Sequence, residues 1–404
     1  MSSPFEERVR ARFPALKRDQ VYLDNAGGSQ TLDTVIDSIR DYLVNDNVQL
    51  GASYTSSRTS TALYSSAYER AAGFLNARGD EVVFAASATQ LLRNLSYALR
   101  FRPGDEIVVS VVDHEANVTP WVDLAHRENL VIKWWRPSLV AAESTVNPTL
   151  SDEGLRKLLS DRTKLVTCTH ASNVLGTVVD VASIATAAHQ VGAMVCVDGV
   201  AYAPHHPIDV KKLGADFYVI SWYKVFGPHI SMLYASWAAQ TNLRSLGHCF
   251  KPAITLADKL GLAGESYELL QAIPHVVDYI DPQKSTFWNE IITHEEQLQT
   301  NLIEYLLGLP DITLYGSEFG SRGYRVPIVS FTIKGRRCKD VVEAIEAKTN
   351  LGLRWGAMYS DRLIRDILGL GPDGVIRVSL VHYNTVAEVE AFKQALDDVI
   401  GNGE

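Results

Sequence analysis

Several features that would assign the chain to a membrane, secreted or nucleic-acid-binding class are missing. No apolar run approaches the ~20 residues that cross a bilayer, and the opening stretch MSSPFEERVRARFPAL has no apolar segment of the kind that signal and transit peptides carry. The four cysteines form no C-x-x-C pair and no metal-ligand spacing, which indicates free thiols in a reducing compartment. The net charge of −9 disfavours binding to phosphate backbones. We therefore expect a cytoplasmic protein with no membrane or nucleic-acid partner.

The sequence does contain a long alternation of strand and helix patterns. Its 404 residues exceed what one small core holds, and 46% of them are hydrophobic, which is ordinary for a globular protein. Short continuous apolar runs are typical of strands buried on both faces of a mostly parallel sheet. The clearest runs are 81–86, 105–114, 130–137, 164–172, 193–199 and 216–224.

From about residue 285 the pattern changes to a long polar helix, two further strand patterns and two further helices. This combination is typical of a small α+β unit. We therefore expect an α/β fold with a large domain over 21–285 and a small C-terminal domain over 286–404. The first residues, 1–20, are expected to add a segment to the small domain.

Polar side chains stand at the ends of four of the predicted strands. His114, Asn173, Asp198 and Lys224 each follow an apolar run, and Lys224 is the only lysine or arginine in DFYVISWYKVFGPHISMLYA. Each of them alone has an ordinary explanation, because strand ends favour turn and cap residues and a lysine can extend its amine to the surface. Ligands of parallel sheets bind beyond the carboxyl ends of the strands, so the four together predict one binding crevice.

The chemistry of these four groups suits pyridoxal 5'-phosphate. Its aldehyde forms a Schiff base with a lysine of lowered pKa, its ring nitrogen needs a carboxylate, and its flat ring needs a stacking partner. Its phosphate needs hydroxyls and the N–H groups of a helix start. The segment FAASATQLLRNL (84–95) offers that last feature, since a strand pattern is followed by Ser87, Ala88 and Thr89 and then by a helical pattern.

The segments that carry these residues resemble the class V aminotransferase family of fold-type I pyridoxal-phosphate enzymes, and within it the cysteine desulfurase-like branch. The likeness extends from VYLDNAGGS (21–29) to IRVSLVHYNTVAEV (376–389). Its most specific motifs are DHEANVTPW, THASNVLGT, VDGVAYAPH and SWYKVFGPH. The resemblance implies an enzyme that uses pyridoxal 5'-phosphate and acts on an amino acid. It also implies a homodimer, for which the loosely matching Gly264, Glu265 and Ser266 are the candidates to reach the partner's site.

The resemblance further implies roles for individual residues. Lys224 is expected to form the Schiff base, Asp198 to pair with the ring nitrogen and His114 to stack on the ring, and these three are the expected catalytic residues. Asn173 is expected near the phenolic oxygen of the cofactor. The other expected cofactor contacts are Ala88 and, at the phosphate, Thr89, Ser221 and Tyr223. The expected substrate contacts are Arg377, Asn25, Arg354 and Tyr359.

Two departures from the desulfurase pattern bear on the reaction. Desulfurases have a glutamine three residues after the aspartate, where this chain has Ala201. They also attack the substrate sulfur with a cysteine on a mobile loop, whereas the corresponding stretch, LGLRWGAMYSDRLIRDILGLGPDG (351–374), has no cysteine and places Tyr359 near that position. Sulfur transfer is therefore not expected.

Several functions stay open at this point. The leading interpretation is cleavage at Cα or Cβ of an amino acid, by decarboxylation or β-elimination, with or without a following carbon–carbon bond to an aldehyde or imine, as in the fungal secondary-metabolism subgroup that the sequence resembles. The alternatives are a simple cysteine-type β-lyase or desulfurase and a non-catalytic cofactor-binding regulator, and transamination ranks lower. No metal site is expected, because the spacing of His205, His206, His229 and His248 matches no ligand pattern.

Overall fold

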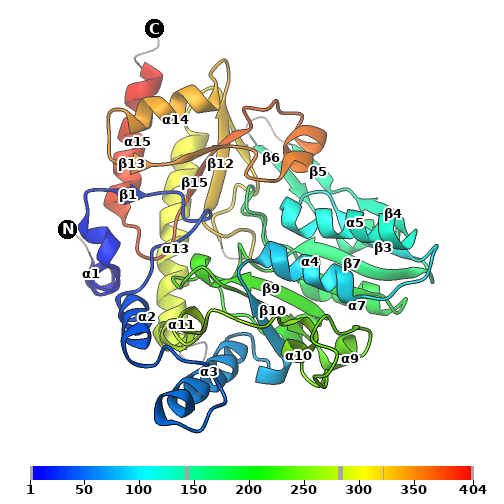
Figure 1. Cartoon of the computed structure of the whole chain (residues 1–404). Coiled ribbons are helices and arrows are strands. Elements are labelled where there is room, and N and C mark those ends of the chain that lie inside the picture. The colour runs from blue at the N-terminus through cyan, green and yellow to red at the C-terminus, as the bar shows by residue number, and fades with distance from the viewer. Residues whose placement is uncertain (1–2, 142–144, 281–284, 322, 402–404) are drawn as a thin grey trace.

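Two sheets of unequal size form the frame of the protein in the computed structural model, which describes residues 3–141, 145–280, 285–321 and 323–401 (Figure 1). The larger sheet has seven strands in the order β2-β10-β9-β8-β7-β3-β4. The strands from β9 to β4 are parallel, and β10 runs antiparallel to both of its neighbours. Their bounds are β2 (Val82–Ala85), β3 (Glu106–Ser110), β4 (Val131–Trp135), β7 (Thr163–Thr169), β8 (Met194–Asp198), β9 (Phe217–Ser221) and β10 (Ser231–Ala235). The predicted mostly parallel sheet is confirmed.

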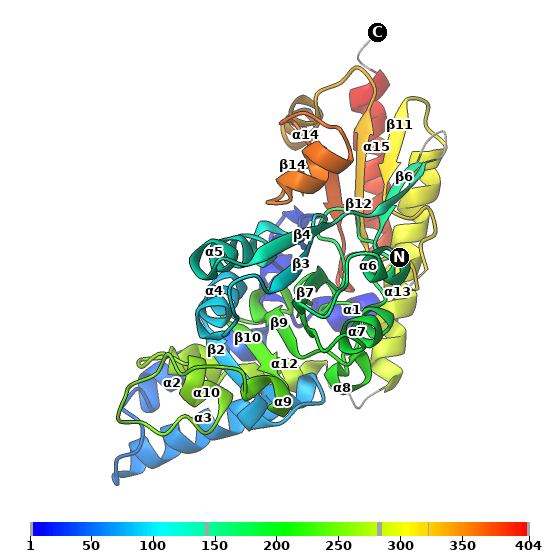
Figure 2. The ribbon, with the colours of Figure 1, turned by 90° about the vertical axis from the view of Figure 1, so that its right-hand side faces the viewer.

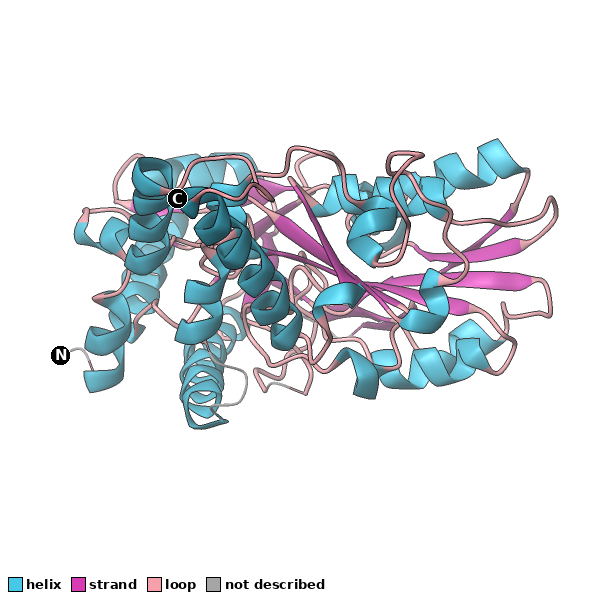
Figure 3. Ribbon diagram, turned by 60° about the horizontal axis from the view of Figure 1, so that its bottom comes forward, coloured by secondary structure: helices cyan, strands magenta, loops and turns pink. Residues whose placement is uncertain are grey.

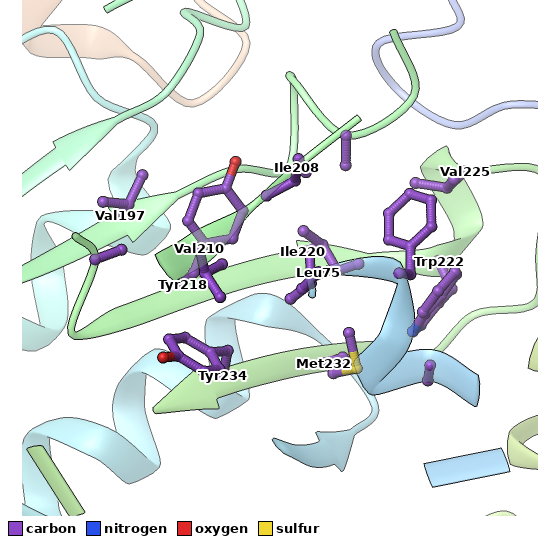
Figure 4. Close-up of a cluster of buried hydrophobic side chains, with 14 of the residues drawn as sticks. Leu75, Val197, Ile208, Val210, Tyr218, Ile220, Trp222, Val225, Met232 and Tyr234 are labelled. Atoms are coloured by element: carbon purple, nitrogen blue, oxygen red, sulfur yellow. The ribbon is translucent and has the colours of Figure 1, made fainter. Parts of the chain in front are cut away.

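Helices cover both faces of this sheet, which explains why most residues of its strands are apolar (Figure 3). Alternate residues of β9 enter different cores: Tyr218 and Ile220 pack with α3, α7 and α12, whereas Phe217 and Val219 pack with α4, α5 and α10. Figure 4 shows the first of these cores around Trp222 and Met232. The helix bounds are α3 (Thr55–Phe74), α7 (Val181–His189), α12 (Ile273–Tyr279), α4 (Ala88–Ala98), α5 (Thr119–Glu128) and α10 (Leu256–Leu260). Each fully buried aliphatic or aromatic side chain contributes ~1.5–3 kcal/mol to this packing.

The smaller sheet has six strands in the order β14-β15-β12-β11-β6-β5. Its strands are β5 (Ser138–Ala141), β6 (Thr145–Thr149), β11 (Ile312–Tyr315), β12 (Ile328–Ile333), β14 (Arg354–Gly356) and β15 (Val375–Ser379). The helices packed with it are α13 (Ser285–Leu307), α14 (Cys338–Glu346) and α15 (Val386–Gly401). Figure 2 shows α13 running alongside both sheets, and its side chains enter both cores, with Trp288 in one and Leu302 in the other.

The domain division into 1–20, 21–285 and 286–404 stays a prediction, and the two sheets do not follow it strictly. The strands β5 and β6, which the sequence analysis did not foresee, lie within 21–285 but join the smaller sheet through the β6–β11 pair. The short strand β1 (Val21–Tyr22) likewise pairs with β13 (Leu351–Gly352). The chain therefore passes between the two sheets more often than the hydrophobic pattern suggested.

The remaining helices are short or peripheral. They are α1 (Pro4–Arg10), α2 (Asp33–Asn45), α6 (Asp152–Arg156), α8 (Val210–Leu213), α9 (Trp237–Gln240) and α11 (Tyr267–Leu270). Arg10 ties α1 to the C-terminal part of the chain, because its Nη1 donates to the Tyr383 carbonyl and to Glu388, each at 2.8 Å. Across the described ranges, none of the helices combines the length and the apolar character needed to traverse a bilayer.

Candidate active site

The residues predicted to hold the cofactor line one cavity with an empty volume of about 470 Å³ at the carboxyl edge of the larger sheet. His114 lies just beyond β3, Asn173 beyond β7, Asp198 at the end of β8 and Lys224 after β9. The structure also brings Ser87, Ala88, Thr89, Ser221 and Tyr223 to the same cavity. Parallel strands direct their carboxyl ends to one edge of a sheet, and this places residues from distant parts of the chain together.

Lys224 ends a short 3-10 turn, Trp222–Lys224, that directly follows β9. The backbone just after it is fixed by the N-terminal segment: Phe226 adopts a φ of 61°, its N–H donates to Ser29 Oγ at 2.9 Å, and its carbonyl accepts from the Leu32 N–H at 3.1 Å. Burial and the positive charge of Arg377 lower the pKa of Lys224 to about 8, although Asp198 and Asp24 oppose the shift. The amine is therefore partly uncharged near neutral pH, as a nucleophilic lysine requires.

Asp198 is buried, and its Oδ1 accepts the Val200 N–H at 2.9 Å. Burial raises its pKa, while that hydrogen bond and the Lys224 charge act in the opposite direction. A second buried carboxyl, Asp113, was not predicted from the sequence. Its only signal there is its place directly before His114 in the motif DHEANVTPW. Burial raises the pKa of Asp113 to about 7, and its Oδ2 accepts Asn117 Nδ2 at 2.6 Å. Asp113 lies near the cofactor cavity but does not line it.

His114 presents a neutral, flat ring to the cavity. Burial, followed by the Lys224 charge, lowers its pKa to about 4, so the imidazole is uncharged at neutral pH. Its Nδ1 accepts the Ala116 N–H at 3.0 Å, which leaves the proton of the neutral ring on Nε2. A neutral ring suits stacking against a pyridine ring that carries positive charge.

The end of the cavity that is predicted to take the cofactor phosphate is built from the start of α4 and the end of β9. Ser87 caps α4 by accepting the Gln90 N–H at 3.1 Å, and the first N–H groups of a helix are free to bind an anion. Ser221 Oγ and Ser231 Oγ lie 2.9 Å apart. Tyr223 stacks almost parallel on His229, with 4.7 Å between ring centroids and 3° between the planes.

A larger cavity of about 1030 Å³ adjoins the first and shares four of its lining residues, Lys224, His114, Asn173 and Tyr223. The residues that it adds include Arg354, Trp355, Met358, Tyr359, Asp361 and Arg377. The structure thus brings three of the four predicted substrate residues, Arg377, Arg354 and Tyr359, to one pocket that opens from the lysine.

Arg377 is held by two groups and keeps one donor without a partner. Its Nη1 donates to the Asn173 carbonyl at 2.9 Å, its Nη2 donates to Asp24 Oδ1 at 2.6 Å, and its buried Nε has no hydrogen-bond partner among the described residues. Arg354 is its direct cross-strand neighbour, and like charges in that position repel. Asp24 offsets the repulsion, because its Oδ2 accepts from Nε and Nη2 of Arg354 at 2.9 and 2.8 Å. Asp24 was not predicted from the sequence, where its only signal is its place beside Asn25 in VYLDNAGGS.

Asn25, by contrast, does not line either cavity, and its role as a substrate contact stays a prediction. It is buried, its Nδ2 donates to the carbonyls of Tyr22 and Ser379 at 2.9 Å, and its Oδ1 accepts from the Tyr383 hydroxyl. Because both the nitrogen and the oxygen of the Asn25 amide are hydrogen-bonded, this side chain holds the N-terminal segment against the C-terminal segment. Asn173 does line both cavities, yet its Nδ2 donates to the Met358 carbonyl at 2.9 Å and its Oδ1 accepts Ser360 Oγ at 3.1 Å.

Other candidates are engaged elsewhere. Glu265, a candidate for crossing a dimer interface, accepts hydrogen bonds from Tyr64 and Tyr68 of its own chain at 2.8 and 3.1 Å. His205 pairs with Glu295 at 2.9 Å, and His248 stacks on Phe250. Within the described ranges, no group of three or more His, Cys, Asp and Glu side chains is placed to hold a metal ion.

The residues around the smaller cavity fit pyridoxal 5'-phosphate. The cavity offers an amine of lowered pKa, a buried carboxylate, a neutral aromatic ring and the start of a helix of eleven residues. Each of these groups answers one chemical need of the cofactor: its aldehyde, its ring nitrogen, its ring face and its phosphate.

The pKa of Lys224 predicts how the cofactor-free protein takes up pyridoxal 5'-phosphate. Only the uncharged amine attacks an aldehyde, and at pH 7 about a tenth of a lysine with a pKa near 8 is uncharged, against about 0.03% at 10.5. The uptake rate, followed by absorbance, should therefore rise with pH and level off just above 8. Arg377→Gln should move that midpoint upward, because the Arg377 charge lowers the pKa. A rate that keeps rising to pH 10 in the unmodified protein would contradict the assignment.

Comparisons with known proteins show the family of the chain. The family model described as aminotransferase class-V matches residues 21–392. The aminotransferase-like protein FGM3 of Gibberella zeae is 53% identical, covering 99% of this chain and 100% of that protein. The cysteine desulfurase-like protein ustD of Aspergillus flavus is 38% identical, covering 98% of this chain and 90% of that protein. The crystal structure of the cysteine desulfurase CsdA from Escherichia coli superposes with a TM-score of 0.85 at 26% identity, covering 98% of both chains.

These matches confirm the resemblance seen in the sequence and the fold-type I architecture. They also confirm pyridoxal 5'-phosphate as the cofactor. They leave the roles of individual residues as predictions. The chain belongs to the class V aminotransferase family and is a cysteine desulfurase-like, pyridoxal-phosphate-dependent enzyme.

Proposed function

We propose that this enzyme cleaves a bond at Cα or Cβ of an amino acid, by decarboxylation or β-elimination, and that an aldehyde or imine then forms a carbon–carbon bond with the product in secondary metabolism. The observation that carries the proposal is the large cavity beyond Lys224. Its lining combines one buried arginine, Arg377, with a wall made of Arg354, Trp355, Met358 and Tyr359, and it contains no cysteine. The cavity extends from Lys224 to Trp355 and Tyr359, which leaves a place for a second reactant beside the amino acid.

The chain's own residues divide the work of such a reaction. The bound cofactor supplies an electron sink that weakens the bonds at Cα. Asp198 is the group to hold a proton on the ring nitrogen, and His114 the group to pack against the ring. Arg377 is held in place by the Asn173 carbonyl and by Asp24, and it orients the substrate through its carboxylate. Lys224, with its lowered pKa, is suited to move a proton at Cα.

The desulfurase alternative lacks its nucleophile in the described part of the chain. None of the four cysteines lines either cavity, and Cys168, Cys196 and Cys338 are buried. Burial raises the pKa of all three thiols, that of Cys338 to about 12, so that little thiolate forms. A simple cysteine-type β-lyase needs no protein thiol and stays the second candidate. The predicted non-catalytic regulator is set aside, because the family is one of enzymes.

Incubation with cysteine and a reductant tests the choice between these candidates. We expect little sulfide above the background of free cofactor, and alkylation of all four cysteines should leave the native reaction largely intact. A β-lyase would release sulfide that persists after alkylation. Rapid release that disappears in Cys249→Ala or Cys338→Ala would instead restore the desulfurase assignment.

A homodimer and a cytoplasmic location belong to the same proposal. A pocket of about 700 Å³ next to the phosphate end is bordered by the exposed stretch 262–264 together with His229 and Glu265. Such a pocket suits a segment of a second copy near the cofactor. Sedimentation of the cofactor-loaded protein measures this directly, and a fully active monomer would exclude it.

A further inference from the structure

The segment over residues 357–362 belongs to the stretch 351–374, which resembles in sequence the mobile loop of desulfurases. It is fastened at several points to the segments that follow β3 and β7. The Glu115 N–H donates to the Tyr359 carbonyl at 2.7 Å, and Arg362 forms an ion pair with the Glu115 carboxylate. On the other side, Asn173 bonds the Met358 carbonyl and the Ser360 hydroxyl. The loop is thus held from two directions, by the segments after β3 and after β7.

The backbone of this loop is strained where it meets the cavity. Met358 and Tyr359 have φ values of 46° and 59°, in the left-handed region. For residues other than glycine, this conformation costs ~1–2 kcal/mol each. A loop free to move would relax out of it, so the strain persists because the fastening contacts outweigh it. These contacts point to a fixed loop rather than to one that swings toward an acceptor.

Glu115 is the centre of the fastening. Its backbone N–H holds Tyr359, its Oε2 pairs with Arg362, and its Oε1 accepts the Thr119 hydroxyl at 2.7 Å. Arg362 also lies over the Trp134 ring, 5.1 Å from its centroid. The carboxylate and the backbone N–H belong to the same residue, Glu115. The ion pair with Arg362 therefore also holds that N–H in place for its hydrogen bond to the Tyr359 carbonyl.

The consequence for the pocket is the position of the Tyr359 ring. The ring lines the large cavity, lies 5.3 Å from the His114 ring and is 74% exposed, although the serine that follows it is buried. An exposed aromatic ring that borders a cavity is a ready contact for an apolar or aromatic group. Arg377 lines the same cavity and offers a carboxylate site.

We propose that Glu115 is a positioning residue that holds Tyr359 as a fixed aromatic wall of the substrate pocket. The enzyme then prefers ligands that carry a carboxylate for Arg377 and an aromatic or apolar group for Tyr359. This preference rests on the proposed function, which assigns the carboxylate to Arg377, whereas the fastening of the loop does not depend on it.

Hydrogen exchange of the cofactor-loaded enzyme, read by mass spectrometry, tests the fastening. In Glu115→Ala and in Arg362→Gln, the amides of the peptide over 357–362 should exchange at least about tenfold faster than in the unmodified protein, because local opening becomes easier. Two controls should leave that peptide unchanged. Glu128→Ala removes an acidic side chain at the end of α5, and Arg365→Gln removes an arginine of the same turn that pairs with Asp361. Unchanged exchange in both Glu115→Ala and Arg362→Gln would overturn the proposal.

Two carboxylates, propionate and 3-phenylpropionate, test the wall through the change that they cause in the absorbance of bound cofactor. 3-Phenylpropionate should bind the unmodified enzyme at least about fivefold more tightly, since an aromatic pair adds to area burial. That ratio should fall close to one in Tyr359→Ala and in Glu115→Ala, with the cofactor spectrum itself unchanged. A ratio near one in the unmodified enzyme would overturn the aromatic preference. Arg377→Gln should weaken both probes alike. If it does not, the assignment of the substrate carboxylate to Arg377 fails. The hydrogen-exchange experiment then still decides whether Glu115 and Arg362 fasten the loop.

Discussion

Replacing Lys224 with alanine should lower turnover by at least about a thousandfold, because the variant loses the amine that we propose attaches the cofactor and moves a proton at Cα. The fold should survive, since Lys224 lines a cavity and the aromatic side chains around it, Trp222 and Phe226, are the ones that fill the core. The measurements are the rate with an amino-acid substrate and peptide mapping after borohydride reduction. Reduction should fix the cofactor on the peptide that contains Lys224.

Lys211→Ala is the matched control. Lys211 is an exposed lysine of α8, the short helix that lies between β8 and β9 in the chain. Its loss should change neither the rate of turnover nor the labelling by borohydride. Labelling of any lysine other than Lys224, or a Lys224→Ala variant that keeps more than about a tenth of the normal rate, would contradict the assignment.

Six of the seven strands of the large sheet were predictable, because most of them are buried on both faces, whereas β10 was not among the predicted strands. Residues such as Tyr218 and Phe217 enter different cores, so the strand has no polar face to interrupt the apolar run. The carboxyl-end rule for parallel sheets then brings His114 and Lys224 together without further information. This part of the site follows from local pattern and one general rule.

The strands β5 and β6 were not predictable in the same way. The stretch Thr145–Thr149 contains Asn147 and Pro148, and a proline within a strand is compatible only with an edge or an irregular position. Its partner strand β11 lies more than 160 residues further along the chain. Pairing of that kind is set by tertiary packing, which the local pattern does not reveal.

The substrate side of the site shows the same limit at the level of single residues. Asp24 and Asn25 are neighbours, but Asp24 reaches Arg377 and Arg354 while Asn25 is taken up by a buried amide network. Only the backbone orientation, set by the isolated bridge between Asp24 and Ser379, decides which of the two side chains faces the arginines. A motif that contains both residues therefore predicts which segment reaches the arginines, but not which of its two side chains does so.

Replacing Asp198 with asparagine should slow turnover by about a hundredfold to a thousandfold, which corresponds to ~3–4 kcal/mol of lost stabilisation. Asparagine preserves the size of the side chain, and its Oδ1 is still able to accept the Val200 N–H, so the cavity should keep its shape. What it removes is the negative charge that we propose holds a proton on the ring nitrogen of the cofactor. Both the rate and the absorbance of the bound cofactor should change, since the ring loses its charged partner.

Asp113→Asn separates this effect from a general loss of buried negative charge. Asp113 is also buried, and the charge of Asp198 contributes to its raised pKa, but Asp113 does not line the cofactor cavity. If direct pairing with the ring nitrogen is what matters, Asp113→Asn should slow the reaction much less than Asp198→Asn and leave the cofactor absorbance close to normal. Equal losses in the two variants would mean that the buried charge acts through the electrostatic field of the site, and near-normal turnover of Asp198→Asn would remove Asp198 from the catalytic set.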